Sequence, residues 1–169
     1  MPDVTFHRLS AEQATTRYDD LRALYAEVYA EPPHRLGDED VEAFRTQFDE
    51  HLALPGFTLL TVESGDELAG FSYCVSFPPG AWWVGTVTPP PLALVLSTKI
   101  AVIELLLRKP YRGAGLGRRL MDTLLAGRPE RYAILLANPE PAARAIYRHW
   151  GWQEAGTVQV RPHWPLSTA

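Results

Sequence analysis

Residues Ile100 to Leu125 read IAVIELLLRKPYRGAGLGRRLMDTLL, and this stretch decides the fold. Its first part, Ile100 to Leu107, is apolar except for Glu104. A nearly unbroken apolar run of this length is typical of a central strand that is covered on both faces. We therefore expect a buried strand that carries one acidic side chain.

A helix is expected after this strand. Leu116, Leu120 and Leu124 follow one another at intervals of four residues, which places them on one face of a helix. Gly127 stands where a glycine commonly ends a helix, because glycine adopts a left-handed backbone conformation without a steric penalty. The pattern predicts a strand and a helix that are joined by a short loop.

The loop between them carries glycine at three alternate positions, in the order Arg112, Gly113, Ala114, Gly115, Leu116 and Gly117. Alternate glycines leave the backbone free for positive φ and let a ligand approach closely. The N–H groups in the first turn of a helix have no internal acceptors and carry the positive end of the helix dipole. Together with Arg112 they predict a site for phosphate oxygens. The alternative is a glycine-rich turn that binds nothing.

The segment from Glu104 to Gly117 resembles motif A of the GNAT superfamily, the general-control-related N-acetyltransferases. The family pattern is Arg/Gln-x-x-Gly-x-Gly/Ala after a strand, and Arg112, Gly115 and Gly117 match it. The family usually has a proline three residues before the arginine, whereas this chain has Lys109 there and its proline one residue later.

A second segment, residues 132–152, resembles motif B of the same family, whose skeleton is Asn-x-x-Ala-x-x-x-Tyr-x-x-x-Gly-aromatic. We expect Tyr132 to Asn138 to form a strand and Pro139 to Trp150 a short helix. The matching positions are Ala143, Tyr147, Gly151 and Trp152. The family asparagine would fall at Glu140, and this chain has Asn138 two residues earlier.

The resemblance implies an α/β fold, the GNAT acyl-CoA N-acyltransferase fold, with a central mixed sheet of about six to seven strands flanked by about four helices. Motif A covers about residues 100–126. A length of 169 residues fits one domain, and a hydrophobic content of 46% is enough for a full core. We therefore expect a single N-acetyltransferase domain over residues 1–169.

The resemblance also implies acetyl-CoA as the cosubstrate. Its pyrophosphate would lie on the backbone amides from Arg112 to Gly117. Its pantetheine arm would lie along the strand residues Leu105, Leu106 and Leu107. Two parallel strands part at this point of the family fold, which frees backbone groups for a ligand. By the same resemblance, Asn138 and Tyr147 are further contacts to the cosubstrate.

Direct acetyl transfer needs an amine that has lost a proton, and an amine with a pKa of roughly 10.4 is mostly charged at neutral pH. Glu104 is the candidate general base, because burial in an apolar strand would raise its pKa toward a useful value. It also matches an acidic position in the corresponding strand of several small-amine acetyltransferases. The alternative is a structural carboxylate that pairs with an arginine or faces solvent.

Tyr147 matches the tyrosine of motif B, which in this family lies beside the thioester sulfur and can donate a proton to the departing thiolate. The resemblance therefore implies Tyr147 as the catalytic acid. The alternative is a core tyrosine on an amphipathic helix, packed with Ile146 and Trp150.

These features lead us to expect an N-acetyltransferase that moves an acetyl group from acetyl-CoA to a primary amine of a small molecule or peptide by direct attack. One alternative is a catalytically silent acyl-CoA-binding regulatory protein of the same fold, and another is an enzyme that uses a longer acyl group. Acids between Asp38 and Glu42 could attract a cationic acceptor, or could serve only the helix dipole. Dimers are common among proteins of this kind, which leaves a homodimer open.

Composition argues against several other classes. The net charge of −4 and the pI near 5.7 argue against nucleic-acid binding, which needs a basic field. The single cysteine, Cys74, cannot form an intrachain disulfide, and no histidine or cysteine cluster has metal-ligand spacing. The N-terminus lacks the pattern of a signal peptide, and no run of about 20 apolar residues could span a bilayer. We expect a cytoplasmic protein with no metal and no membrane partner.

The remaining elements are predicted from the same signals. A first strand ends near Ser10, which can cap the next helix, and Asp38 is the expected N-cap of a later one. The other expected elements are helices over 18–30 and 38–54 and strands over 57–63, 68–77 and 157–161. Residues 78–97 form a long connection, in which Trp82 and Trp83 could wall a substrate cleft or cap the core.

Overall fold

The structure is a computed structural model that describes residues 3–32, 34–162 and 166–169. The chain forms two compact units. The first unit consists of Met1–Val75 and Ile103–Arg128, and the second of Ser76–Val102 and Pro129–Ala169.

The first unit contains most of a mixed β-sheet. Its strands are β1 (Thr5–Leu9), β2 (Thr58–Ser64), most of β3 (Glu67–Phe77) and the second half of β5 (Lys99–Leu107). Strand β1 pairs antiparallel with β2, and β2 pairs antiparallel with β3. The hydrogen-bonded order of the sheet is β1-β2-β3-β5-β6, in which β6 is Tyr132–Leu135. The strands predicted over 57–63 and 68–77 are thereby confirmed, and together they form a hairpin.

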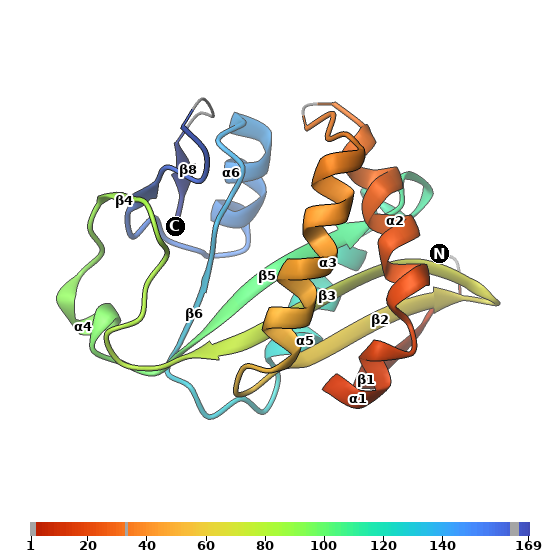
Figure 1. The fold of residues 1–169 in the computed structure, drawn as a ribbon, viewed down its shortest axis with the longest axis horizontal. Helices are drawn as coiled ribbons and strands as arrows, with labels where there is room; N and C mark the ends of the chain where they lie inside the picture. The colour runs from red at the N-terminus through yellow and green to blue at the C-terminus, as the bar shows by residue number, and fades with distance from the viewer. Residues whose placement is uncertain (1–2, 33, 163–165) are drawn as a thin grey trace. The chain divides into compact units, whose positions relative to one another are not determined.

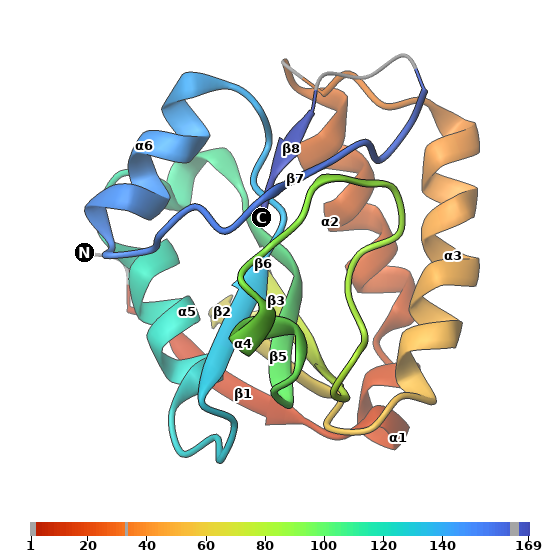
Figure 2. The same ribbon diagram turned by 90° about the vertical axis from the view of Figure 1, so that its left-hand side faces the viewer.

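Helices cover both faces of the sheet in the first unit. Figure 1 and Figure 2 show α2 (Tyr18–Ala30) and α3 (Asp38–Leu52) on one face and α5 (Leu116–Leu125) on the other. A short helix, α1 (Ala11–Thr15), follows β1. Helix α2 has the predicted bounds. Gly127 follows α5 with a φ of +73°, as predicted for a glycine that ends a helix.

Aromatic side chains fill the core of the first unit. The rings of Tyr25 and Phe44 stack with their centroids 4.2 Å apart, and Phe48 lies edge-on to Tyr73 at 5.4 Å. Phe44, Phe48 and Tyr73 are almost completely buried. Leu106 of β5 belongs to the same cluster, so the second half of β5 is packed into the core that α2 and α3 cover.

Two helices of the first unit begin with side-chain hydrogen bonds. The Ser10 hydroxyl accepts a hydrogen bond from the N–H of Gln13 at 3.3 Å, so Ser10 acts as a cap, although the helix that it caps is the unexpected α1. The prediction of Asp38 as the N-cap of α3 is wrong, because the N-cap is Gly37. Glycine has no side chain to cap with, and the Asp40 carboxylate instead accepts a hydrogen bond from the N–H of Gly37 at 3.0 Å. Helix α3 also ends two residues before the predicted end.

The second unit combines the first half of β5 with a small separate sheet. Strand β6 (Tyr132–Leu135) pairs with β5 in parallel. The small sheet has the order β4-β7-β8 and consists of β4 (Thr86–Thr88), β7 (Thr157–Val158) and β8 (Ser167–Thr168). The helices of this unit are α4 (Leu92–Val95) and α6 (Pro141–His149).

Lys99, the first residue of β5, holds the two ends of the long connection over residues 78–97. Its side chain is fully buried. Its ammonium group donates to the carbonyl oxygens of Ser97 at 3.0 Å, Val95 at 3.1 Å and Pro78 at 3.4 Å. A buried ammonium group needs such acceptors, because desolvation without hydrogen bonds is costly.

The two tryptophans of this connection pack within the second unit. The ring of Trp83 lies at a steep angle to that of Phe77, with centroids 5.0 Å apart. The ring centroid of Trp82 lies 5.9 Å from the Lys99 ammonium nitrogen. These contacts favour the interpretation that the tryptophans cover a core rather than wall a substrate cleft.

The predicted fold class, a mixed α/β fold of the GNAT type, is confirmed. The strands among the described residues form a five-stranded and a three-stranded sheet instead of one sheet. The short helices α1 and α4 and the strands β4 and β8 were not expected, and β7 covers only the first two residues of the strand predicted over 157–161. Within the described part of the chain, every helix falls short of the length and apolarity needed to cross a bilayer.

Candidate active site

The end of β5 leaves part of its backbone beyond the pairing with β6. The parallel ladder between these strands ends at Val102, which pairs with Leu135. Strand β5 itself continues to Leu107. The residues predicted to pair with a pantetheine arm, Leu105, Leu106 and Leu107, lie beyond that last pair. They therefore have no partner in β6, and the carbonyl oxygen of Leu107 accepts a hydrogen bond from Arg112 Nε.

The glycine loop has the expected backbone conformation at two of its three glycines. Gly113 has a φ of +82° and Gly115 a φ of +78°, both in the left-handed region. A Cβ built on either residue would have no neighbouring atom within 4 Å. The space in front of both glycines is therefore open to a ligand. The expectation of positive φ does not hold for Gly117, which is the second residue of α5 and helical.

The start of α5 makes the loop region a hydrogen-bond donor with partial positive charge. The helix begins at Leu116 with Gly115 as its N-cap, and no side chain caps it. The N–H groups of its first turn therefore keep their hydrogen-bonding capacity, and the positive end of the helix dipole lies with them. The loop, which also contains Ala114, is open at its glycines and leads into a helix without a side-chain cap. Such a structure fits the oxygens of a pyrophosphate.

Arg112 binds protein groups in this structure. Its Nε donates to the carbonyl oxygen of Leu107 at 2.7 Å. Its Nη1 and Nη2 donate to the carboxylate of Glu31, at the C-terminal end of α2, at 2.8 and 3.0 Å. The hydrogen bonds from Arg112 lower the pKa of Glu31. Arg112 therefore ties the start of the loop to β5 and α2, and a phosphate would have to share its guanidinium group with Glu31.

Glu104 is buried and faces α2. Side chains alternate in burial along the second half of β5, with Glu104 and Leu106 on the buried side. The phenol of Tyr29 donates to Glu104 Oε2 at 2.6 Å. Burial raises the pKa of Glu104 to about 7, and the hydrogen bond from Tyr29 opposes this rise. A carboxyl group with such a pKa can accept a proton from an amine near neutral pH.

The alternative roles considered for Glu104 do not fit its surroundings. Only 8% of the residue is exposed, so it does not face solvent. No arginine in the described ranges forms an ion pair with it. The phenol of Tyr29 binds its carboxylate, and its charge contributes to the raised pKa of Tyr73, after burial. The Tyr73 hydroxyl lies 3.0 Å from Nδ1 of His51, whose pKa burial lowers.

Tyr147 belongs to the second unit, where it lies half-buried on α6 and lines a cavity of about 550 Å³. Its ring lies edge-on to Trp150 at 5.6 Å and to Trp152 at 6.2 Å. Ile146 is 49% exposed. The alternative prediction for Tyr147 was a core tyrosine packed with Ile146 and Trp150. Its ring does contact Trp150, but Ile146 is not part of a buried core.

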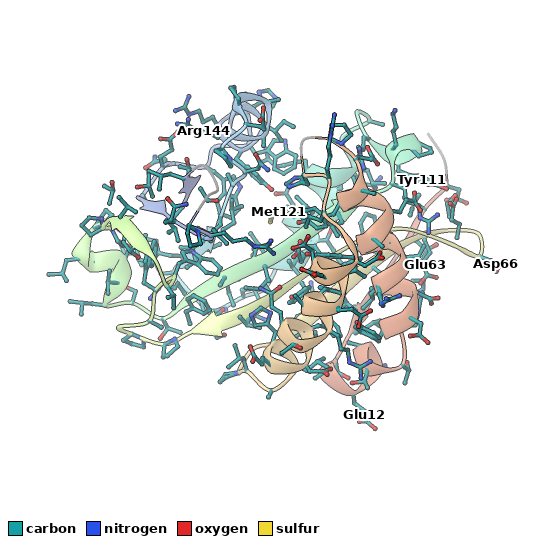
Figure 3. The ribbon with its side chains drawn as sticks, turned by 45° about the horizontal axis from the view of Figure 1, so that its top comes forward. Glu12, Glu63, Asp66, Tyr111, Met121 and Arg144 are labelled. Atoms are coloured by element: carbon teal, nitrogen blue, oxygen red, sulfur yellow. The ribbon has the colours of Figure 1, made fainter. Side chains whose placement is uncertain are left out.

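Asn138 has a local structural partner. Its Oδ1 accepts a hydrogen bond from the N–H of Glu140 at 2.9 Å, in the turn that leads into α6. It is not among the residues that line the cavity beside Tyr147. Arg144, labelled in Figure 3, lines that cavity and binds Glu154 at 2.7 Å. Arg148 pairs with the same carboxylate, so two cations share one acid at the cavity.

Two residues of the first unit that contact the candidate site were missed by the sequence analysis. Tyr29 contacts the proposed base, and Glu31 contacts the arginine of the loop. Both stand in the last turn of α2 or just after it. The sequence signals only that Tyr29 shares the apolar face of a helix, which predicts burial and names no partner.

Solved structures of other proteins, among them acetyltransferases, share this fold. A structure of the aminoglycoside N-acetyltransferase AAC(6')-Iy in complex with CoA aligns with a TM-score of 0.64 and 12% identity, over 94% of this chain and 93% of that chain. A protein from Pyrococcus horikoshii OT3 aligns with a TM-score of 0.69 and 18% identity, over 98% and 96%. The ribosomal-protein-alanine N-acetyltransferase from Brucella melitensis biovar Abortus 2308 aligns with a TM-score of 0.59 and 16% identity, over 94% and 98%. At these identities the likeness shows a shared fold.

A family model also matches this chain. The model described as the acetyltransferase (GNAT) family matches residues 18–152, which is most of the chain. The chain therefore belongs to the acetyltransferase (GNAT) family. A comparison with curated protein sequences gave no significant match.

Proposed function

We propose that this protein is an N-acetyltransferase that transfers the acetyl group of acetyl-CoA to a primary amine by direct attack. The observation that carries the proposal is Glu104, a buried carboxyl group whose pKa burial raises to about 7, on the strand that leads into the glycine loop. Membership of the GNAT family supports the same reaction. The family match spans both units, which supports one acetyltransferase domain over residues 1–169.

In this proposal the glycine loop holds the pyrophosphate of the cosubstrate. The backbone at Gly113 and Gly115 and the first turn of α5 supply the N–H donors. The backbone of Leu105–Leu107 pairs with the pantetheine arm. Arg112 keeps the loop in place through Leu107 and Glu31 and lends positive charge to the site.

Glu104 begins the chemistry by taking a proton from the protonated amine, whose nitrogen keeps the electron pair. The neutral amine then attacks the thioester carbonyl carbon, so that a C–N bond forms and the C–S bond breaks. Tyr147 donates its phenolic proton to the departing thiolate. The nitrogen loses its second proton as the amide forms, and this proton restores Tyr147 directly or through water. The balance is one amide, one thiol and one released proton.

The acceptor is proposed as a primary amine of a small molecule, with peptide amines as a second group to test. Aminoglycosides belong in the first panel, because structures of aminoglycoside acetyltransferases share the fold. Polyamines belong there too, because four acids stand between Asp38 and Glu42. Acyl-CoA esters longer than acetyl-CoA complete the panel and test the size of the acyl group.

Isothermal titration with CoA and acetyl-CoA tests the cosubstrate site. We expect micromolar binding by the wild type and none by Gly115→Asp, because the variant places a negative charge and a strained side chain in the loop. Gly65→Asp is the matched control. Gly65 also has a positive φ, +59°, and open space around it, but it lies in the hairpin between β2 and β3. Wild-type protein that binds neither ligand would overturn the proposal.

Release of free thiol over the amine panel then tests the reaction. Turnover with an amine, lost in Glu104→Gln, is the expected result. Binding of acetyl-CoA without turnover on any member of the panel would instead favour the alternative function, a silent acyl-CoA-binding regulator of the same fold.

A further inference from the structure

Tyr29 holds the carboxylate of Glu104, the proposed base, through a short hydrogen bond. Its phenol donates to Glu104 Oε2 at 2.6 Å, a short distance that is typical of an O–H group bound to a carboxylate. The two residues are 75 positions apart in the sequence, so the contact is a product of the fold. It joins the last turn of α2 to the second half of β5, inside the first unit.

The position of the Tyr29 ring is fixed by its neighbours. The ring centroid of Tyr25 lies 4.5 Å away, and the ring of His34 stands edge-on at 4.8 Å. Two residues after Tyr29, Glu31 is bound by Arg112, which also binds the end of β5. The phenol is therefore a pre-positioned donor on a helix end that is itself tied to the strand of the base.

The other groups that face Glu104 cannot replace this donor. Tyr73 of β3 is close enough for Glu104 to affect its pKa, and its hydroxyl is engaged with His51 of α3. Burial lowers the pKa of His51, so its imidazole is mostly neutral at pH 7. In the chain as far as the structure describes it, no lysine or arginine pairs with Glu104. The ionised carboxylate thus depends on the phenol of Tyr29.

We propose that Tyr29 is a positioning residue for the proposed base: it occupies Oε2 of Glu104 and stabilises the carboxylate, so that Oε1 is the oxygen that receives the proton of the amine. This inference rests on the proposed function for the identity of the base. In the step itself an N–H bond of the ammonium group breaks and an O–H bond forms at Oε1. Tyr29 keeps its own proton throughout.

The first test measures the titration of Glu104 without any substrate. The carboxyl carbons are labelled with ¹³C, and the signal of Glu104 is identified by its loss in Glu104→Gln. We expect its pKa to move upward in Tyr29→Phe, since the phenol opposes the effect of burial. Tyr18→Phe is the matched control, because it removes a phenol from the buried face of the same helix and should leave the titration of Glu104 unchanged.

A second variant is expected to shift the pKa of Glu104 in the opposite direction. Difluorotyrosine at position 29 is a stronger hydrogen-bond donor than tyrosine, so the pKa of Glu104 should move downward. Opposite shifts in the two variants support the inference even if Tyr29→Phe also loosens the packing. An unchanged pKa of Glu104 in both variants would overturn it.

The second test uses the reaction. In Tyr29→Phe, kcat/KM with the amine found in the panel should fall about 3- to 10-fold at pH 7 and recover as the pH is raised, because the acidic limb of the profile follows the base. A loss of the same size at every pH would indicate a merely structural role and contradict the inference. The titration of Glu104 needs neither CoA nor amine, so a failed proposal for the enzyme and a failed proposal for Tyr29 give different results.

Discussion

Arg112 and Glu31 form a bidentate ion pair, in which Nη1 and Nη2 of the arginine lie 2.8 and 3.0 Å from the two carboxylate oxygens. The side chains are 38% and 31% exposed, so the pair is expected to add at most about 1 kcal/mol to stability. Its position matters more than its energy. It places a negative charge beside the loop that is proposed to bind pyrophosphate.

Replacing Glu31 should therefore strengthen the binding of CoA. We expect Glu31→Gln to lower the dissociation constant about 2- to 5-fold at low salt, because the change removes a like charge and frees the guanidinium group of Arg112. Isothermal titration measures the effect, and added salt should diminish it. Glu12→Gln is the control, since Glu12 is an exposed acid on α1. Weaker binding by Glu31→Gln would show that the ion pair acts mainly by holding the loop in place.

The raised pKa of Glu104 has a consequence for stability. A carboxyl group with a pKa of about 7 in the folded state and an ordinary value of 4.5 in the unfolded state binds more protons when folded. Its contribution to the stability of the folded state is therefore fully present below pH 4.5 and is lost as the pH rises through 7. The two pKa values differ by about 2.5, which corresponds to about 3 kcal/mol in the free energy of unfolding.

Glu104→Gln should be more stable than the wild type at high pH and inactive. The amide cannot ionise, so we expect its advantage in unfolding free energy to grow from near zero at pH 4.5 to about 3 kcal/mol at pH 8. Denaturant unfolding of both proteins at several pH values measures this difference, and effects of other titrating groups cancel in it. A difference that does not change with pH would mean that Glu104 is not strongly perturbed.

Much of the first unit follows from local patterns. The helix at Tyr18–Ala30 was predicted from apolar side chains at helical spacing, and the loop conformation at Gly113 and Gly115 from the need for positive φ. Such features depend on residues that are close in sequence, so a single chain carries their signals. The motifs of a known family added the positions of the candidate site.

The rest depends on contacts between distant residues. The pairing of β4 with β7 needs Gly156, where a Cβ would lie 2.5 Å from the carbonyl oxygen of Thr88. The partner of Glu104 is a tyrosine 75 positions away. The sequence could show that such glycines and tyrosines exist, but their partners are determined by packing. The start of α3 was mispredicted for a different reason, because its N-cap is a glycine whose N–H donates to the carboxylate of Asp40, three residues later.

Three carbonyl oxygens accept hydrogen bonds from the Lys99 ammonium group, so we expect the loss of this group to reduce the local stability of the chain. Lys99→Met keeps the length of the side chain and removes the ammonium donor from the oxygens of Pro78, Val95 and Ser97. The oxygens of Pro78 and Val95 keep backbone donors, which are the N–H groups of Ala81 and Gly80. We expect a loss of about 1 to 3 kcal/mol in the free energy of unfolding and faster cleavage of the connection over residues 78–97 by chymotrypsin. Lys109→Met is the control, because that lysine is exposed. Unchanged cleavage of Lys99→Met would mean that the connection does not depend on the ammonium group.

The role of Tyr147 can be separated from its packing by one substitution. Tyr147→Phe keeps the ring that lies edge-on to Trp150 and Trp152 and removes only the hydroxyl. If the hydroxyl protonates the departing thiolate, turnover should fall about 10²-fold or more while the dissociation constant of CoA stays within about twofold. The melting temperature should not change. Full turnover together with a lowered melting temperature would instead assign Tyr147 to the packing of α6.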